Sequence, residues 1–273
     1  MLDRKIIDKS FTEAFICSQI NENQKLTSDR KSYFYNPNLI ITFSLSDYQK
    51  YILNYDNVVA VAVTENEIEQ IISGFELIPN TKAIKYWLLN NKIVLLQFEP
   101  KFFKLNGKKN KKIRYVRNYY SKLQNIKILE EPVYKKDVKA FLRKWKLLRK
   151  NSTNRPRIGI DRNFIFKYAL KNNEKFIKHF FYFDDTLIGY SIIEKVDENH
   201  YNHLCRKADT TFNNLGLYID FFAYNEISNK LNNSFIVNIG NTGGHDSLLR
   251  EKTENFPVFF VFDCFDITVK KTV

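Results

Sequence analysis

The chain has 273 residues, of which 44% are hydrophobic and 15% aromatic, so it can bury a core large enough for one large domain or two smaller ones. Its 24 Phe and 16 Tyr, beside only 8 Gly and 6 Pro, exclude an intrinsically disordered chain, because burial of so much apolar surface offsets the entropy lost on ordering. The formal net charge of +13 indicates an anionic partner.

The first hundred residues alternate short strand-like and helical patterns. Strands are predicted at 39–43, 58–63 and 92–98, and the amphipathic run NEIEQIISGF predicts a helix between the last two. The polar residues 90–92 predict a turn before the third strand. The start of the chain, MLDRKIIDKSFTEAF, lacks the apolar core of a signal peptide, and no run approaches the roughly 18 apolar residues that span a bilayer. We therefore expect a cytoplasmic protein without membrane insertion.

The excess positive charge is concentrated between Lys101 and Lys150. Eighteen basic residues and three acids give this segment a charge of +15, so the rest of the chain sums to −2. Helices with basic outer faces are predicted at 106–122 and 134–149, and a short strand at 127–129. The candidate nucleic-acid-binding residues are Lys108, Lys109, Lys111, Lys112, Arg114 and Arg117.

Two explanations of this basic segment stay open. A lysine-rich proteome can produce a solvated helix face that binds nothing. A solvated face, however, normally carries acids in i,i+4 pairs, and none occurs between Lys101 and Lys127. A polyanion, held through its phosphates and stacked on Tyr115, Tyr119 or Tyr120, is therefore the other explanation.

The polar segment NSTNRPRIGIDR at 151–162 predicts a boundary between two domains, 1–150 and 151–273. Beyond it the patterns predict, in order, a helix from Phe164, a hairpin turning at Asp184–Asp185–Thr186, a strand at 201–208, the helix LGLYIDFFAYNEISNKL, the strand SFIVNIG, the helix SLLREKTEN and the strand VFFVFDCFDITV.

This order of elements, over about 165–269, resembles the GNAT acyltransferase fold. The tract from Arg206 to Pro257 further resembles the phosphatidylglycerol lysyltransferase C-terminal-like proteins, which consist of two tandem GNAT-like domains and are related to the Fem aminoacyltransferases. The basic run LNGKKNKKIRYVRNYY followed by Trp145 extends the resemblance. The residues that carry it in the tract are Lys207, Ala208, Asp209, Gly216, Leu217, Tyr218, Asn238, Gly244, Arg250, Lys252 and Pro257.

The resemblance implies an α/β protein with a mixed sheet, two tandem GNAT-like domains and acyl or aminoacyl transfer. Tyr218 and Asp220, near the start of a helix at the centre of such a fold, are the catalytic candidates, although a core position is the commoner fate of a tyrosine. The general base stays open. The candidate substrate-binding residues are Lys207, Asn238, Gly243, Gly244, Arg250 and Lys252. The glycines belong to GNTGG, which either cradles an anion with its backbone N–H groups or forms a tight turn.

The donor is open at this point. The Gln/Arg-x-x-Gly-x-Gly/Ala loop that holds the pyrophosphate of acetyl-CoA is absent before LGLYIDFF, which favours aminoacyl-tRNA, an RNA held mostly through its phosphates. The alternatives are a CoA-dependent N-acyltransferase acting on an amino sugar, protein or small amine, and a catalytically inactive nucleic-acid-binding protein. Neither G-x-S-x-G nor a Walker loop occurs, so no motif supports a hydrolase or a nucleotide triphosphatase.

No metal is expected. Cys17, Cys205 and Cys264 are widely spaced and odd in number, which indicates reduced thiols and neither a disulfide framework nor a zinc site. His200 and His203 form H-x-x-H, but no third ligand stands at a suitable spacing.

Overall fold

The structure, a computed structural model, describes most of the chain. The described residues are 9–12, 14–15, 26–29, 32–35, 39–42, 57–73, 83–149, 162, 164–171, 173–241 and 246–272. They belong to two compact units. The first consists of Met1–Leu95, Gly240–Lys252 and Phe260–Val273, and the second of Leu96–Ile239 and Thr253–Phe259.

These units divide the chain differently from the predicted domains 1–150 and 151–273. Both basic helices belong to the second unit, together with most of the predicted C-terminal domain. The chain returns to the first unit over Gly240–Lys252 and again over Phe260–Val273, which includes most of its last strand. A local change of composition can mark at most one of the points where the chain passes from one unit to the other. Strand pairing, in contrast, joins segments that lie far apart in the sequence. Residues 151–161, on which the predicted boundary rested, lie outside the described residues.

The described part of the first unit contains strands of a mixed sheet together with helices. Its strands follow the order β1-β2-β3-β4-β11, with β3 parallel to β4 and the other neighbours antiparallel. The elements are β1 (Leu26–Asp29), β2 (Ser32–Tyr35), β3 (Leu39–Thr42), β4 (Asn57–Val63), α4 (Glu65–Ser73), the first part of β5 (Ala83–Phe98), α9 (Asp246–Thr253) and most of β11 (Val258–Thr272). The predicted β3, β4 and α4 are confirmed, and β1 and β2 had not been predicted.

The predicted turn at 90–92 is wrong, because β5 runs through it without interruption. The polar side chains there contact the neighbouring β11. The Asn91 side chain donates a hydrogen bond to Asp266 over 3.1 Å, and Lys92 pairs with Asp263. Cross-strand partners thus make polar residues compatible with a continuous strand.

The second unit is built on a sheet with the order β10-β9-β8-β7-β6, in which β9 and β10 are parallel and the other pairs antiparallel. The strands are β6 (Ile126–Leu129), β7 (Phe176–Phe183), β8 (Thr186–Lys195), β9 (His200–Ala208) and β10 (Phe235–Asn241). The predicted hairpin is confirmed. Asp184 and Asp185 form its two-residue turn with φ values of 45° and 61°, as a type I′ turn requires.

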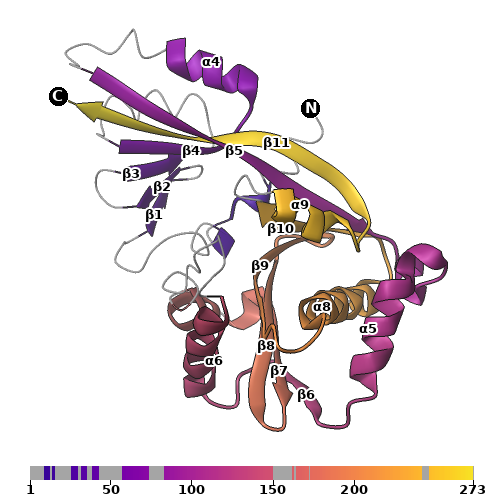
Figure 1. Cartoon of the computed structure of the whole chain (residues 1–273). Coiled ribbons are helices and arrows are strands. Elements are labelled where there is room, and N and C mark those ends of the chain that lie inside the picture. Colours follow the sequence, from indigo (N-terminus) through magenta and orange to yellow (C-terminus); the bar gives the residue numbers. More distant parts are fainter. Residues whose placement is uncertain are drawn as a thin grey trace. The chain divides into compact units, whose positions relative to one another are not determined.

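Helices cover both faces of this sheet (Figure 1). On one face lies α6 (Lys135–Leu148), and on the other lies α8 (Leu215–Leu231), against which α5 (Lys111–Ser121) packs. The described elements of the unit also include η2 (Pro100–Lys104), η3 (Lys108–Asn110), the π-helical η4 (Phe164–Ala169) and η5 (Asn173–Lys175). No helix of the described part of the chain is both long and apolar enough to cross a membrane.

The helix α6 shows how the sequence determines an element. Tyr134 caps it, with a backbone N–H that donates to the Asp137 carboxylate, and Val138, Phe141 and Leu142 are buried against the sheet. The predicted helix from Tyr134 is therefore confirmed. Cys205 and Cys264 are buried free thiols, as expected, and Cys17 lies outside the described residues.

Candidate active site

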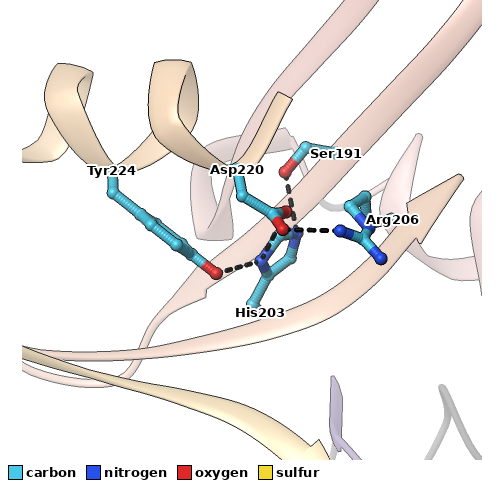
Figure 2. A network of polar contacts seen from close by, with 5 residues as sticks. All are labelled: Ser191, His203, Arg206, Asp220 and Tyr224. Atoms are coloured by element: carbon cyan, nitrogen blue, oxygen red, sulfur yellow. Dashed lines mark hydrogen bonds and ion pairs between the residues drawn. The ribbon is translucent and has the colours of Figure 1, made fainter. Parts of the chain in front are cut away.

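A network of five polar side chains joins β8, β9 and α8 in the second unit (Figure 2). His203 lies at its centre. Its Nε2 is 3.0 Å from the Ser191 hydroxyl, and its Nδ1 is 2.7 Å from the Tyr224 hydroxyl and 3.8 Å from the Asp220 carboxylate. Arg206 donates to the other oxygen of Asp220 over 2.6 Å. The network therefore combines one ion pair with a histidine that both neighbouring hydroxyls hold in place.

A β-bulge in β9 brings two of these residues to the same face. His203 and Cys205 pair with consecutive residues of β8, so Leu204 is an extra residue. Side chains of a regular strand alternate between faces, and the extra residue shifts this alternation by one. As a result His203 and Arg206 both face α8, although three positions separate them. Lys207 faces α6.

The exposure of the side chains decides which of them a substrate can meet. Ser191 is 0% exposed and His203 5%, whereas Asp220 is 13% and Arg206 29% exposed. Ser191 is therefore placed to orient the imidazole and not to attack a substrate. Tyr224 is fully buried, and desolvation raises the pKa of its phenol well above 10, so it remains a neutral hydroxyl. Asp220 and Arg206 form the accessible end of the network.

The network lies where two strands of the sheet part. The parallel pairing of β9 with β10 ends at Asn202 and Asn238, one residue before His203. Asn238 donates to the Asn202 side chain over 3.3 Å, and Asn202 donates to Glu194 over 2.9 Å. All three side chains are buried. The predicted substrate-binding residue Asn238 is thus placed in a row of buried polar groups across three strands.

The structure does not bring the two catalytic candidates together. Residues two positions apart on an α-helix project in nearly opposite directions, and α8 follows this rule. Asp220 faces β9, whereas Tyr218 packs among buried apolar residues and stacks on Tyr120 of α5. Burial raises the pKa of Tyr218. Of the pair, only Asp220 belongs to the polar network.

The remaining candidates are spread over the molecule. Lys207 lies over the ring of Trp145 on the α6 side, 5.0 Å from its centroid. Arg250 and Lys252 lie on α9, in the first unit. Gly243 and Gly244 fall outside the described residues. The structure therefore does not test the predicted anion-binding role of the GNTGG segment.

The predicted nucleic-acid-binding residues differ in what they contact. Lys108, Lys109, Lys111 and Lys112 are exposed. Arg114 instead donates to the backbone carbonyl oxygens of Leu105 and Gly107, and so holds the turn that precedes α5. The Arg117 guanidinium donates to the neighbouring Asn118 side chain.

Two exposed aromatic side chains of α5 follow these lysines, of which Lys108 and Lys109 lie on η3 and Lys111 and Lys112 at the start of α5. Tyr115 is 64% and Tyr119 48% exposed, and their rings are nearly parallel with centroids 6.5 Å apart. The apolar side of the helix, with Ile113, Val116 and Tyr120, is buried. The outer face therefore offers ammonium groups and flat aromatic surfaces together.

The sequence analysis missed four of the five network residues, namely Ser191, His203, Arg206 and Tyr224. His203 had been considered only as half of an H-x-x-H metal pair, and regular alternation would have placed it on the face opposite Arg206. In the described part of the chain, no three His, Cys, Asp or Glu side chains are grouped so as to hold a metal ion. One signal in the sequence could have indicated the network. Asp220 and Tyr224 lie one helical turn apart in LGLYIDFFAYNEISNKL, so a helix places both polar side chains on one face.

Comparison with known proteins gives matches to solved structures only. No family model and no curated protein matches the chain. A conserved protein of unknown function from Bacteroides thetaiotaomicron is 13% identical, with a TM-score of 0.60 over 98% of this chain and 90% of that one. The C-terminal domain of a putative lysylphosphatidylglycerol synthetase from Agrobacterium fabrum is 10% identical, with a TM-score of 0.56 over 98% and 90%.

A tandem GNAT protein from the clavulanic acid biosynthesis pathway is 6% identical, with a TM-score of 0.50 over 88% of this chain and 77% of that one. At such identities the similarity concerns the fold. The order of β7, β8, β9, α8, β10, α9 and β11, with β9 and β10 parallel before they part, agrees with it. The chain has a mixed α/β, GNAT-like fold.

Proposed function

We propose that the protein is an acyl- or aminoacyltransferase that modifies an amine or hydroxyl acceptor. The observation that carries this proposal is the His203 network beside the end of the β9–β10 pairing, with an aspartate and an arginine at its accessible end. Acyl transfer needs a group that takes a proton from the acceptor and a donor for the developing oxyanion. Asp220 and Arg206 supply these two chemical functions.

The proposed step conserves atoms and charge. The acceptor nitrogen or oxygen attacks the carbonyl carbon of an activated ester or thioester, and its proton passes to the Asp220 carboxylate. Arg206 stabilises the negative charge on the carbonyl oxygen of the tetrahedral intermediate. The intermediate collapses, the bond from carbon to the leaving oxygen or sulfur breaks, and the leaving group takes up the proton from Asp220, which restores the carboxylate. The His203 ring, with its Nδ1 3.8 Å from the Asp220 carboxylate, limits the orientations that this carboxylate can take.

Aminoacyl-tRNA is the donor that the second unit fits best. Residues 210–214, which lead into α8, contain no glycine and therefore no loop of the kind that holds the CoA pyrophosphate. In the same unit α5 presents exposed lysines beside Tyr115 and Tyr119. Phosphates pair with lysines and unpaired bases stack on aromatic rings. We therefore assign the outer face of α5 to the RNA part of the donor.

The test offers both donor classes to the purified protein. Labelled acetyl-CoA and a mixture of labelled aminoacyl-tRNAs are each incubated with a panel of amines and hydroxyl compounds, and transfer of the label is measured. We expect transfer from aminoacyl-tRNA, and a loss of at least about 100-fold in Asp220→Asn and Arg206→Met. Glu226→Gln, which removes another carboxylate of α8, is the matched control and should keep full activity.

Each other result has a definite meaning. Transfer from acetyl-CoA alone would identify a CoA-dependent N-acyltransferase with the same site. Absence of transfer from both donors, together with tight and salt-sensitive RNA binding, would overturn the enzymatic proposal and indicate a nucleic-acid-binding protein with a GNAT-like fold.

A further inference from the structure

Gly216 is the second residue of α8, at a position where the backbone itself does not require glycine. Among the described glycines, a left-handed φ occurs at Gly107 and Gly240, and Gly216 has the ordinary conformation of a helix. Glycine stabilises a helix less than alanine does, because it loses more backbone freedom on folding. A glycine in a regular helix is favoured where a neighbouring group approaches too closely for a side chain.

At Gly216 the neighbouring group is the Arg206 guanidinium, which reaches α8 from β9. A Cβ placed on Gly216 would lie 3.2 Å from Arg206 Nη1 and 3.4 Å from its Cζ, closer than the roughly 3.5–4.0 Å at which such atoms pack best. The same Nη1 donates the 2.6 Å hydrogen bond to Asp220, one helical turn further along α8 (Figure 2). The guanidinium therefore lies between the Gly216 backbone and the Asp220 carboxylate.

A second glycine at the interface of α8 with the sheet shows a different role. A Cβ on Gly189 of β8 would lie 2.9 Å from the Lys207 carbonyl oxygen and 2.5 Å from Ile219 Cδ1, so Gly189 allows α8 to pack on the sheet. Around Gly216, the nearest group apart from the guanidinium is the Ala208 Cβ at 3.8 Å, an ordinary contact. Gly216 thus makes room for one arginine side chain and not for the sheet.

We propose that Gly216 is a positioning residue, whose missing side chain determines where the Arg206 guanidinium lies beside Asp220. This role rests on the acyl transfer proposed above, in which Arg206 stabilises the oxyanion. A methyl group on Gly216 presses on Nη1, the atom that bonds to Asp220, and displaces it by a few tenths of an ångström. Because an oxyanion donor acts only at about 2.7–3.1 Å from the developing charge, this displacement lowers the rate of transfer.

Urea unfolding tests the contact between Gly216 and Arg206 without any assay of transfer. Four proteins are compared, namely the wild type, Gly216→Ala, Arg206→Ala and the double variant. In the Arg206→Ala background the new methyl group meets no guanidinium, so we expect Gly216→Ala to raise the urea midpoint through the helix propensity of alanine. With Arg206 present this gain should disappear, and the two effects on the unfolding equilibrium constant should differ by at least about threefold.

Gly189→Ala is the matched comparison in the same unfolding experiment. Its methyl group meets the Lys207 carbonyl oxygen and the Ile219 side chain, neither of which depends on Arg206. We expect it to lower the urea midpoint by the same amount in the wild-type and Arg206→Ala backgrounds. A coupling to Arg206 is therefore expected for Gly216 and not for Gly189.

The kinetics of transfer test the positioning role itself. Gly216→Ala should lower kcat by about tenfold and leave KM nearly unchanged, because Arg206 acts on the transition state and not on the bound donor. Asn229→Ala places another alanine in α8, at an exposed position, and should keep the kcat of the wild type. A merely structural role of Gly216 would change the urea midpoint and leave the kcat of the folded protein as it was.

The proposal is overturned if Gly216→Ala has the same effect on stability with and without Arg206, or if its kcat equals that of the wild type. If Gly216→Ala does not fold, recovery of folding on addition of Arg206→Ala supports the proposal, and failure of the double variant to fold contradicts it. A wild-type protein that transfers no group from any donor overturns the proposed function alone, because the unfolding experiment still decides whether Gly216 positions Arg206.

Discussion

The rings of Tyr120 in α5 and Tyr218 in α8 stack with their centroids 4.7 Å apart and their planes at 21°. The Tyr120 hydroxyl continues beyond this contact and donates a hydrogen bond of 2.8 Å to the carbonyl oxygen of Asn213, just before α8 begins. The two tyrosines thus join the basic helix to the helix that carries Asp220.

Because the Tyr218 ring stacks on Tyr120, removing only its hydroxyl distinguishes a structural role of Tyr218 from a catalytic one. Tyr218→Phe keeps the stacked ring and should leave both transfer and the free energy of unfolding nearly unchanged, within about 0.5 kcal/mol. Tyr120→Phe should cost about 1 kcal/mol, because it leaves the Asn213 carbonyl without its donor. Urea unfolding of both variants measures the difference. A large loss of transfer in a fully stable Tyr218→Phe would instead support the original catalytic assignment.

The ion pair between Arg206 and Asp220 should contribute to stability as well as to catalysis. Both side chains are largely buried, at 29% and 13% exposure, so each charge is poorly solvated without the other. A double-mutant cycle with Arg206→Met and Asp220→Asn should give a coupling energy of about 1–3 kcal/mol. The pair Lys127–Asp185, which spans 2.8 Å on the surface, is the matched comparison and should show no measurable coupling. Equal coupling in the two pairs would contradict the role given to burial.

His179 should make the protein sensitive to mild acid. Its ring is buried on β7 against Phe222, and desolvation, aided by the charge of Lys230, lowers its pKa from 6.5 to about 4. Between these values the unfolded chain binds a proton that the folded chain does not. Stability should therefore be complete above about pH 6.5, fall as the pH drops to about 4 by roughly 3 kcal/mol, and level off below.

His179→Leu removes the titrating group and should remove this part of the pH dependence. Unfolding by urea at pH 7, 5.5 and 4 measures it, with the wild type and the variant compared at each pH. If both lose the same free energy between pH 7 and 4, other groups cause the acid sensitivity.

The outer face of η3 and α5 should bind RNA through two separable contributions, from lysines and from tyrosines. Replacing Lys108, Lys109, Lys111 and Lys112 by Glu should abolish tRNA binding in a filter assay, because the phosphates lose their counter-charges. Tyr115→Ala with Tyr119→Ala should weaken binding of unpaired RNA by about 1–3 kcal/mol per stacked base and leave the salt dependence unchanged. Salt-independent binding that survives the four Glu substitutions would exclude this face.

The prediction of the fold succeeded where local chemistry decides the structure. Asp184 and Asp185 tolerate the positive φ of a hairpin turn, and Asp137 is spaced to complete the cap of α6, so both elements can be inferred from adjacent residues. The prediction of a turn at 90–92 failed because the partner of the Asn91 side chain, Asp266, lies 175 residues later in the sequence. Such information is absent from the local sequence.

The candidate site was predicted only in part for the same reason. Asp220 could be chosen from its place on α8, but the partners His203 and Arg206 depend on strand pairing. Arg114 was predicted to bind a phosphate from its charge alone. In the structure its guanidinium donates hydrogen bonds to two backbone carbonyl oxygens. A charge count cannot distinguish a side chain that meets solvent from one that completes a turn.

Because Leu204 is an extra residue in β9, the polar network depends on the number of residues between its members as well as on their types. With all residues kept, a regular strand would turn His203 and Arg206 to opposite sides of β9, whereas deleting Leu204 together with the bulge would leave them two positions apart and on the same side. In related sequences, therefore, the histidine and the arginine can share a face at a spacing of three positions with a bulge or of two positions in a regular strand, and a search for this site should accept both.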